Sequence, residues 1–107
     1  MSRLLLTNGR VATPAGVIDD AQVAIDGDTI VAIGRDLAAD GDRIDLGGDL
    51  LVPGFIDTQV NGGGGRLFND DPSADTIAAI GAAHRPYGTT AFLPTLISDD
   101  VAVIDRA

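Results

Sequence analysis

The chain has 107 residues, of which 45% are hydrophobic, so it can form a folded core and general disorder is not expected. Its net charge of −9 repels phosphate backbones and anionic lipids, so neither nucleic acid nor a membrane is expected as a partner. The absence of cysteine excludes a disulfide scaffold and a cysteine-based zinc site. No apolar run approaches the roughly 20 residues that a membrane span needs. The short apolar start is too small for a signal peptide, and we therefore expect a cytoplasmic protein.

The first half of the sequence reads as closely spaced strands. Residues 3–7 and 10–13 are expected to pair around a tight turn at Asn8-Gly9. Residues 21–34 predict a hairpin around Asp26-Gly27-Asp28. Two more short strands are expected at 43–46 and 50–52. Together these signals predict an antiparallel β unit over residues 1–52.

The pattern changes after Pro53-Gly54. FIDTQV, residues 55–60, is mostly apolar, as in a strand of a parallel sheet that is covered on both faces. A glycine-rich loop follows, and Ser73 can then cap a helix. Apolar residues recur at helical spacing after it, and Pro86 and Gly88 are expected to end this helix.

A second strand is expected at residues 89–97, broken by Pro94, and Ser98-Asp99-Asp100 is expected to open a further helix. The order strand, helix, strand, helix is typical of the opening of a parallel α/β domain. Two parallel strands and a helix of about two turns do not complete such a domain. We therefore expect residues 53–107 to be the start of a truncated α/β domain, and the chain to be a piece of a longer protein.

The most informative short stretch is FIDTQVNGGGG, residues 55–65. Gln59 and Asn61 lie two residues apart on the predicted strand, so both side chains face the same side. They are interpreted either as a strand-end cap or, preferably, as groups that line a site together with Gly62 and Gly63. Carboxamides are much weaker zinc ligands than imidazole, so we expect these two side chains to form hydrogen bonds and not to bind metal.

The four glycines leave two readings open, a tight turn or a loop at the edge of a site. A nucleotide-binding role is not favoured, because the stretch lacks the third glycine of G-x-G-x-x-G and the Gly-Lys-[Ser/Thr] of a P-loop. Three neighbouring polar residues were also considered. His84, near a helix end, is expected at the surface, where the helix dipole favours its charged form. Asp57 is either a buried acceptor or a group behind the site, and Arg66 is more readily a solvated loop charge than a ligand for a sugar phosphate.

Longer stretches carry a family resemblance. DLGGDLLVPGFIDTQVNGGGGRLFND and HRPYGTTAFLPTLIS resemble the amino-terminal part of the N-acetylglucosamine-6-phosphate deacetylases, a family of the amidohydrolase superfamily. The segment Pro53-Gly54-Phe55-Ile56-Asp57 matches the lead-in to the first barrel strand of that superfamily. Gln59-Val60-Asn61-Gly62 takes the place of its usual His-x-His. The resemblance covers essentially the whole chain.

The resemblance implies a fold and an activity. The fold is a small β-sandwich part, residues 1–52, followed by the first β/α units of a (β/α)₈ barrel from residue 53. The activity is metal-dependent removal of acetate from N-acetylglucosamine 6-phosphate in amino-sugar catabolism. The family's divalent metal, zinc or similar, is held by a Glu and two His on later strands, and its base is a later Asp. No catalytic or metal-binding residue is therefore expected within residues 1–107, and this segment alone is expected to be inactive.

The resemblance also implies a homodimer for the complete enzyme. Two alternatives stay open at this point. One is another amidohydrolase, such as one that acts on cyclic amides, although most of those keep His-x-His. The other is a non-catalytic β-rich binding module with an α/β extension.

Overall fold

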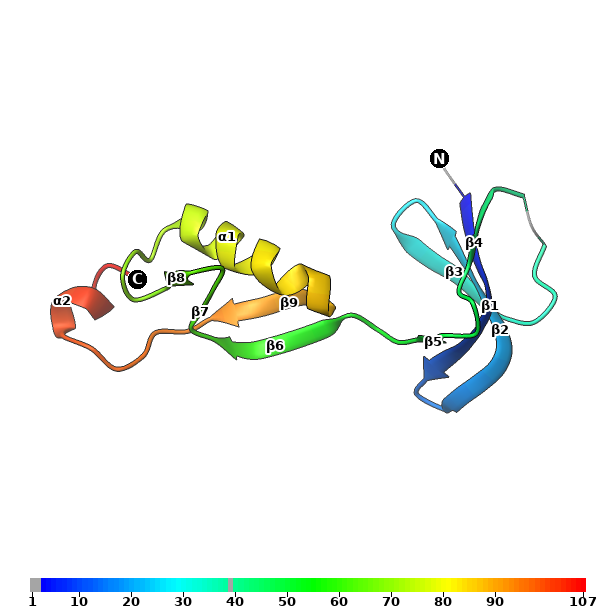
Figure 1. The fold of residues 1–107 in the computed structure, drawn as a ribbon, viewed down its shortest axis with the longest axis horizontal. Coiled ribbons are helices and arrows are strands. Elements are labelled where there is room, and N and C mark those ends of the chain that lie inside the picture. The colour runs from blue at the N-terminus through cyan, green and yellow to red at the C-terminus, as the bar shows by residue number, and fades with distance from the viewer. Residues whose placement is uncertain (1–2, 39) are drawn as a thin grey trace. The chain divides into compact units, whose positions relative to one another are not determined.

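A computed structural model describes residues 3–38 and 40–107. The chain divides into two compact units, Met1–Pro53 and Gly54–Ala107 (Figure 1). Each unit has its own sheet and its own buried cluster. None of the helices in the described ranges has both the length and the apolar character required to cross a membrane.

Unit 1 is a five-stranded sheet in which strand β1 is central. The strands are β1 (Arg3–Thr13), β2 (Gly16–Asp26), β3 (Thr29–Gly34), β4 (Asp42–Asp45) and β5 (Leu50–Leu51). Strands β1, β2 and β3 pair antiparallel, as expected, but β4 and β5 both pair parallel to β1. The prediction of a wholly antiparallel unit is therefore wrong. The sheet is mixed because the chain crosses back to the far side of β1 after β3.

The prediction of a turn at Asn8-Gly9 is also wrong, because β1 continues through both residues. Asn8 has a φ of +57°, and the pairing of β1 with β2 shifts register on either side of Gly9. These features describe a β-bulge, which bends the strand without reversing it. Gly9 is buried, and a Cβ there would lie 2.7 Å from Cδ1 of Leu46, so the bulge brings the backbone close to the β4–β5 connection. The chain reverses instead between Thr13 and Gly16, where the Thr13 hydroxyl donates a hydrogen bond of 2.8 Å to the Gly16 carbonyl oxygen.

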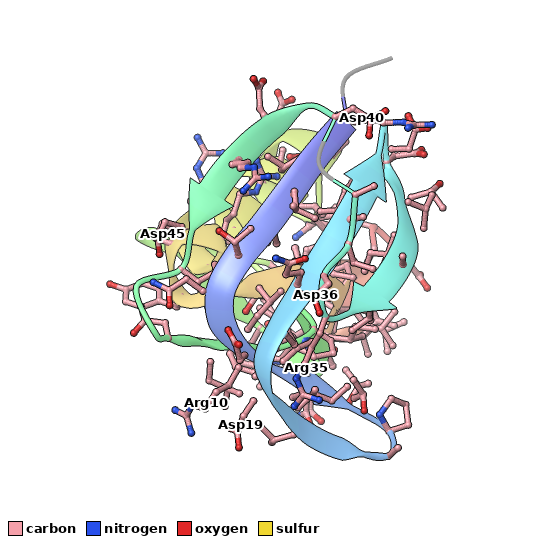
Figure 2. The ribbon with its side chains drawn as sticks, turned by 90° about the vertical axis from the view of Figure 1, so that its right-hand side faces the viewer. Arg10, Asp19, Arg35, Asp36, Asp40 and Asp45 are labelled. Carbon is pink, nitrogen blue, oxygen red and sulfur yellow. The ribbon has the colours of Figure 1, made fainter. Side chains whose placement is uncertain are left out.

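The second turn of unit 1 agrees with the sequence. Asp26 pairs with Thr29 across Gly27-Asp28, which confirms the predicted hairpin. Val11, Ala21 and Val23 form the buried cluster, and partly buried apolar side chains surround it: Leu6, Ile18, Ile25 and Leu51. At the surface, Figure 2 shows Arg35 next to Asp19; the Nε and Nη2 atoms of Arg35 donate hydrogen bonds of 3.1 and 2.8 Å to the Asp19 carbonyl oxygen.

Unit 2 contains two parallel strands with one helix packed against them. Strand β6 (Phe55–Val60) pairs parallel with β9 (Thr89–Pro94), and helix α1 (Ala74–His84) lies along one face of this pair (Figure 1). Val60, Phe68 and Ile80 form the buried cluster between helix and strands. The strand–helix–strand order predicted from the sequence is confirmed.

The predicted helix boundaries of unit 2 are confirmed, with one refinement. The Ser73 hydroxyl accepts a hydrogen bond of 3.2 Å from the Thr76 backbone N–H, as expected of an N-cap. After α1 the chain tightens into the short 3₁₀ helix η1 (Arg85–Tyr87), which contains Pro86, and Gly88 ends it with a φ of +97°.

The end of the chain is less regular than expected. Strand β9 stops at Pro94, so the strand predicted over 89–97 is three residues too long. Proline lacks the N–H needed to extend the ladder, which accounts for the early end. Helix α2 (Val101–Ile104) follows, and Asp100 precedes it without a side-chain capping bond.

Candidate functional site

The carboxyl ends of β6 and β9 are joined by the side chain of Asn61. Its Nδ2 donates a hydrogen bond of 2.9 Å to the Thr95 carbonyl oxygen, and the Thr95 N–H donates one of 2.9 Å to the Val60 carbonyl. Both contacts lie where two parallel strands end. In open α/β sheets and in α/β barrels, binding sites lie at this edge. Asn61 therefore stands at the expected edge, and its amide N–H already holds the neighbouring strand end.

The glycine-rich stretch forms a tight hairpin. Strand β7 (Gly62–Gly63) pairs antiparallel with β8 (Arg66–Leu67), and Gly64 and Gly65 have φ values of +60° and +78°. Two consecutive positive φ angles are the requirement of a two-residue type I′ turn. The tight turn expected from the glycines is therefore observed, and the reading as a loop at the edge of a site stays a prediction.

His84 does not have the free surface role expected for it. Its Nε2 lies 3.0 Å from the carbonyl oxygen of Gly62, and the side chain is half-buried. Because a carbonyl oxygen only accepts, Nε2 carries a proton in this contact. A Cβ on Gly63 would lie 2.8 Å from the same nitrogen, so glycine there is needed for the imidazole to approach. The end of α1 thus anchors the glycine hairpin. In the sequence, the run of glycines was the one signal that another group approaches the backbone there.

Asn69 is a polar residue of this region that sequence reasoning missed. Its side chain is only 5% exposed. Nδ2 donates to the Ile97 carbonyl at 2.9 Å and to Oδ2 of Asp99 at 3.0 Å, and Oδ1 accepts from the Ile97 N–H at 2.9 Å. The amide of Asn69 holds the pKa of the Asp99 carboxyl below its usual range, and the Asp100 backbone N–H adds to this effect. Asparagine next to Asp70 looked like an ordinary loop residue, and its burial depends on the tertiary fold.

Gln59 and Asp57 lie on β6 and are both exposed. The backbone N–H of Gln59 donates to Oδ1 of Asp57 at 3.1 Å. Asp57 is therefore not the buried acceptor that one reading of the sequence allowed. The structure brings Asn61, Gly62 and Gly63 together with His84 and Thr95. Gln59 is not part of this group: it is exposed, and its backbone N–H contacts Asp57.

Arg66 follows the glycine turn and reaches the start of α1. Its Nη1 lies 3.5 Å from the hydroxyl of Thr76, which is 1% exposed and donates to Asp71 at 2.9 Å. A shallow hollow in this region is also lined by Asp70. Two carboxylates and one guanidinium line this hollow, which disfavours an anionic ligand, so the lining agrees with the solvated-charge reading of Arg66.

Across residues 3–38 and 40–107, no three His or Asp side chains gather closely enough to hold a metal ion. The candidate groups at the strand ends are neutral amides, which are weak ligands for zinc. The described residues of this segment therefore do not fit a metal centre on their own.

Comparison with known proteins gives a consistent picture, although no family model matches the sequence. Over 75 residues, or 70% of this chain, it is 49% identical to the N-acetylgalactosamine-6-phosphate deacetylase of Shewanella sp. (strain ANA-3). Over 95 residues, or 87% of the chain, it is 39% identical to the N-acetylglucosamine-6-phosphate deacetylase of Haemophilus influenzae. The chain is similar to amino-sugar-phosphate deacetylases. It spans only 19% and 25% of the length of these two deacetylases.

Solved deacetylase structures extend the similarity to nearly the whole fold. The N-acetylglucosamine-6-phosphate deacetylase from Pasteurella multocida matches 97% of this chain with a TM-score of 0.89 and 34% identity, over 28% of its own length. A variant of the Mycobacterium smegmatis deacetylase, solved in complex with N-acetyl-D-glucosamine-6-phosphate, matches 97% with a TM-score of 0.83 and 33% identity, over 27% of its length. The resemblance inferred from the sequence is confirmed, and the reading as a non-catalytic binding module is not favoured.

Proposed function

We propose that this chain is the amino-terminal part of an enzyme that hydrolyses the acetamide of N-acetylglucosamine 6-phosphate to give glucosamine 6-phosphate and acetate. The observation that carries this proposal is the match of 97% of the chain to a deacetylase with a TM-score of 0.89. Sequence identity of 39% to a second deacetylase over 87% of the chain supports the same activity.

The proposed architecture of the complete enzyme has two parts. Residues 1–52 would contribute to a small β-sandwich, and residues 53–107 would form the first β/α units of a (β/α)₈ barrel. The parallel β6–β9 pair with α1 on one face is the repeating unit of such a barrel, which supports this assignment. A homodimer and a cytoplasmic location complete the proposal, as the family resemblance and the sequence suggest.

Within this segment, we assign Gln59, Asn61, Gly62 and Gly63 to the lining of the substrate site. Asn61 lies at the carboxyl end of β6, and the glycine hairpin follows directly. Gln59 is exposed on β6 with a polar amide that can bind a sugar hydroxyl or the acetamide. The family's divalent metal is proposed for the complete enzyme only, and its ligands are assigned to residues outside this segment.

A second substrate deserves the same test. The relative that is 49% identical over 70% of the chain is named for N-acetylgalactosamine 6-phosphate, and this identity exceeds that to the glucosamine enzyme. The two sugars differ only in the configuration at C4. A site that hydrogen-bonds a hydroxyl can reject the wrong epimer strongly, because a buried polar group would lose its partner.

The test is to read the gene beyond codon 107 and to express the complete protein. Acetate release is then measured from both sugar phosphates, with residues 1–107 alone as the inactive reference. Deacetylation of either sugar by the complete protein supports the proposal, and the ratio of kcat/KM identifies the sugar. If the complete protein binds metal, is folded and releases acetate from neither sugar, the proposed function is wrong.

The site assignment has its own variant pair. Gln59→Ala in the complete protein should lower kcat/KM at least about tenfold, which corresponds to the loss of roughly one hydrogen bond in the transition state. Thr58→Ala is the matched control, since Thr58 is the exposed neighbour of Gln59 on β6 and is not assigned to the site. Equal effects of the two substitutions would contradict a specific role for Gln59.

A further inference from the structure

The segment that follows β9 is irregular, yet two asparagine side chains hold it at three backbone groups. Asn61 binds the Thr95 carbonyl, and Asn69 binds both the N–H and the carbonyl of Ile97. Backbone groups that leave a sheet need such partners when they are not fully solvated. The path of residues 95–99 therefore depends on side-chain amides and not on a ladder of strands.

Of the two asparagines, Asn69 is the one whose replacement should disturb more hydrogen bonds. It is buried, its Oδ1 accepts one hydrogen bond, and its Nδ2 donates two. A leucine, which has the same branching, would keep the burial and leave the Ile97 backbone unpaired, which costs more than the net value of the bonds themselves. The second N–H of Asn69 is directed to a carboxylate, and hydrogen bonds to charged acceptors are the stronger kind.

We propose that Asn69, with Asp99 as its carboxylate partner, is a positioning residue that fixes residues 95–99 next to Asn61. Asn69 accepts and donates at Ile97, and Asn61 holds Thr95 two residues earlier, so both ends of this stretch are fixed from the glycine-hairpin side of unit 2. The consequence for catalysis rests on the proposed function, because only then does this strand-end edge belong to an active site.

The chemistry of the Asn69–Asp99 contact gives a selective test in the complete protein. Asn69→Asp is nearly isosteric and keeps the acceptor for the Ile97 N–H, but it removes both Nδ2 bonds and places a carboxylate against Asp99. Two carboxylates this close do not both ionise readily, so one takes up a proton as the pH falls. Asn69→Asp should therefore loosen residues 95–99 at neutral pH and tighten them again when the pair shares a proton.

The readout is hydrogen exchange at the backbone amide of Ile97, expressed as a protection factor so that the intrinsic effect of pH is removed. Asn69→Asp should lower this protection at least about tenfold at pH 7, with recovery near pH 4. The double variant Asn69→Asp, Asp99→Asn should restore part of the protection at pH 7, because the new amide at position 99 donates to the new carboxylate while the Ile97 carbonyl stays without its Nδ2 donor. A purely steric role for Asn69 would show neither the pH recovery nor this rescue.

Asn8→Asp is the matched control. Asn8 donates from Nδ2 to Oδ1 of Asp45 at 2.7 Å in unit 1, so the same substitution creates the same pair of carboxylates at an exposed place. It should leave the protection of Ile97 unchanged. If Asn69→Asp also melts α1, Asp99→Ala takes its place, with an expected two- to fivefold loss of protection at Ile97 and none in α1.

Two measurements separate this proposal from the proposed function. Unchanged protection at Ile97 in Asn69→Asp and in Asp99→Ala, or no rescue by the double variant, overturns the positioning role. If the protein deacetylates, Asn69→Asp should lower kcat more than it raises KM, and the double variant should recover kcat. A complete protein without deacetylase activity would refute the proposed function, and the exchange result at Ile97 would still decide the role of Asn69.

Discussion

The two units of the chain differ in what they bury. In unit 1 the buried side chains among the described residues are apolar, and the backbone ladders of five strands provide the order. Unit 2 has only two main strands, and it buries two polar side chains, Asn69 and Thr76, each with its hydrogen-bond partners. A buried amide or hydroxyl costs free energy unless it is paired, so such groups constrain geometry more than they add stability.

This difference indicates where the chain needs defined geometry. The polar contacts of unit 2 hold the glycine hairpin, the start of α1 and the strand ends. The hairpin and the end of β6 include Asn61, Gly62 and Gly63, which are proposed to line the substrate site. The following predictions test whether the two units respond separately and whether unit 2 is the more exacting one.

The largest effect is expected in the two buried clusters. Ile80 in unit 2 and Val23 in unit 1 are 0% and 2% exposed. Ile80→Ala should reduce the free energy of unfolding by about 2–5 kcal/mol, because it removes three buried carbons and leaves a cavity. Val23→Ala is the counterpart in unit 1, and it should cost less because it removes two carbons.

Hydrogen exchange measured along the chain checks the separation. Ile80→Ala should weaken protection in α1 and β9 and leave the β1–β2 amides unchanged, and Val23→Ala should do the reverse. A loss of protection in both units from either variant would show that they unfold as one cooperative body.

A smaller effect is expected for Gly62→Ala in the hairpin. A Cβ at this position would clash with the backbone carbonyl oxygen of Arg66, and a backbone group cannot move aside cheaply. We expect a loss of about 1–3 kcal/mol in unfolding free energy, in the range of other overpacking substitutions. Gly34→Ala in unit 1 is the control: its nearest neighbour would be 3.6 Å away, and it should change stability by less than about 0.5 kcal/mol. Equal losses in urea unfolding would contradict this reading.

The N-cap of α1 should contribute about 1 kcal/mol to the free energy of unfolding. Ser73→Ala removes the bond to the Thr76 N–H and also a partner of the Asp71 carboxylate. Asp100 precedes α2 without a side-chain capping bond, so Asp100→Ala should be close to neutral. Thermal unfolding followed by circular dichroism would distinguish the two, and a loss from Asp100→Ala as large as that from Ser73→Ala would be unexpected.

The smallest effect is expected on the pKa values of Asp45 and Asp99, each of which accepts a hydrogen bond from an asparagine. The pKa of Asp45 is lowered first by the Gly47 backbone N–H and then by Asn8, whereas that of Asp99 is lowered first by Asn69. A carboxyl with a lowered folded pKa contributes stability above its unfolded pKa near 4, and this is lost as the pH falls through the folded value.

Carboxyl titration by NMR should therefore show a clear asymmetry between the two units. Asn69→Ala is expected to raise the pKa of Asp99, because it removes the first cause of the lowering. Asn8→Ala is expected to have a smaller effect on the pKa of Asp45, because the Gly47 N–H, the first cause of its lowering, remains. A larger change at Asp45 than at Asp99 would reverse the assigned causes.

Much of unit 2 could be predicted because its signals are local. Ser73 caps α1, Pro86 and Gly88 end the helix region, and residues 55–60 form the predicted strand. Asn61 could be assigned to the strand-end edge for the same reason, since alternation along a strand is local. The resemblance to deacetylases was visible in the sequence because it lies in contiguous stretches.

Apart from the strand that ends early at Pro94, the errors have one physical cause in common, which is a contact with a distant part of the chain. Asn8-Gly9 has the composition of a turn, but in the fold it forms a bulge within β1. Asn8 donates a hydrogen bond to Asp45, and Leu46 lies close to Gly9. The parallel partners of β1 come from residues more than thirty positions away, so hairpin reasoning does not find them. His84 and Asn69 were missed as anchors because Gly62 and Ile97 meet them only in the folded chain.

The register of β6 and β9 has a consequence for how the chain folds as it is synthesised. Phe55 pairs with Thr89, so β6 leaves the ribosome more than thirty residues before its partner. The hairpins of unit 1 can close at once, whereas β6 must wait while a long loop is still being made. Ile56 and Leu93 stay 72% and 58% exposed even when the strands are paired. The nascent chain therefore presents the apolar surface of β6 until β9 has been made, and slower translation of residues 61–94 should increase its capture by chaperones.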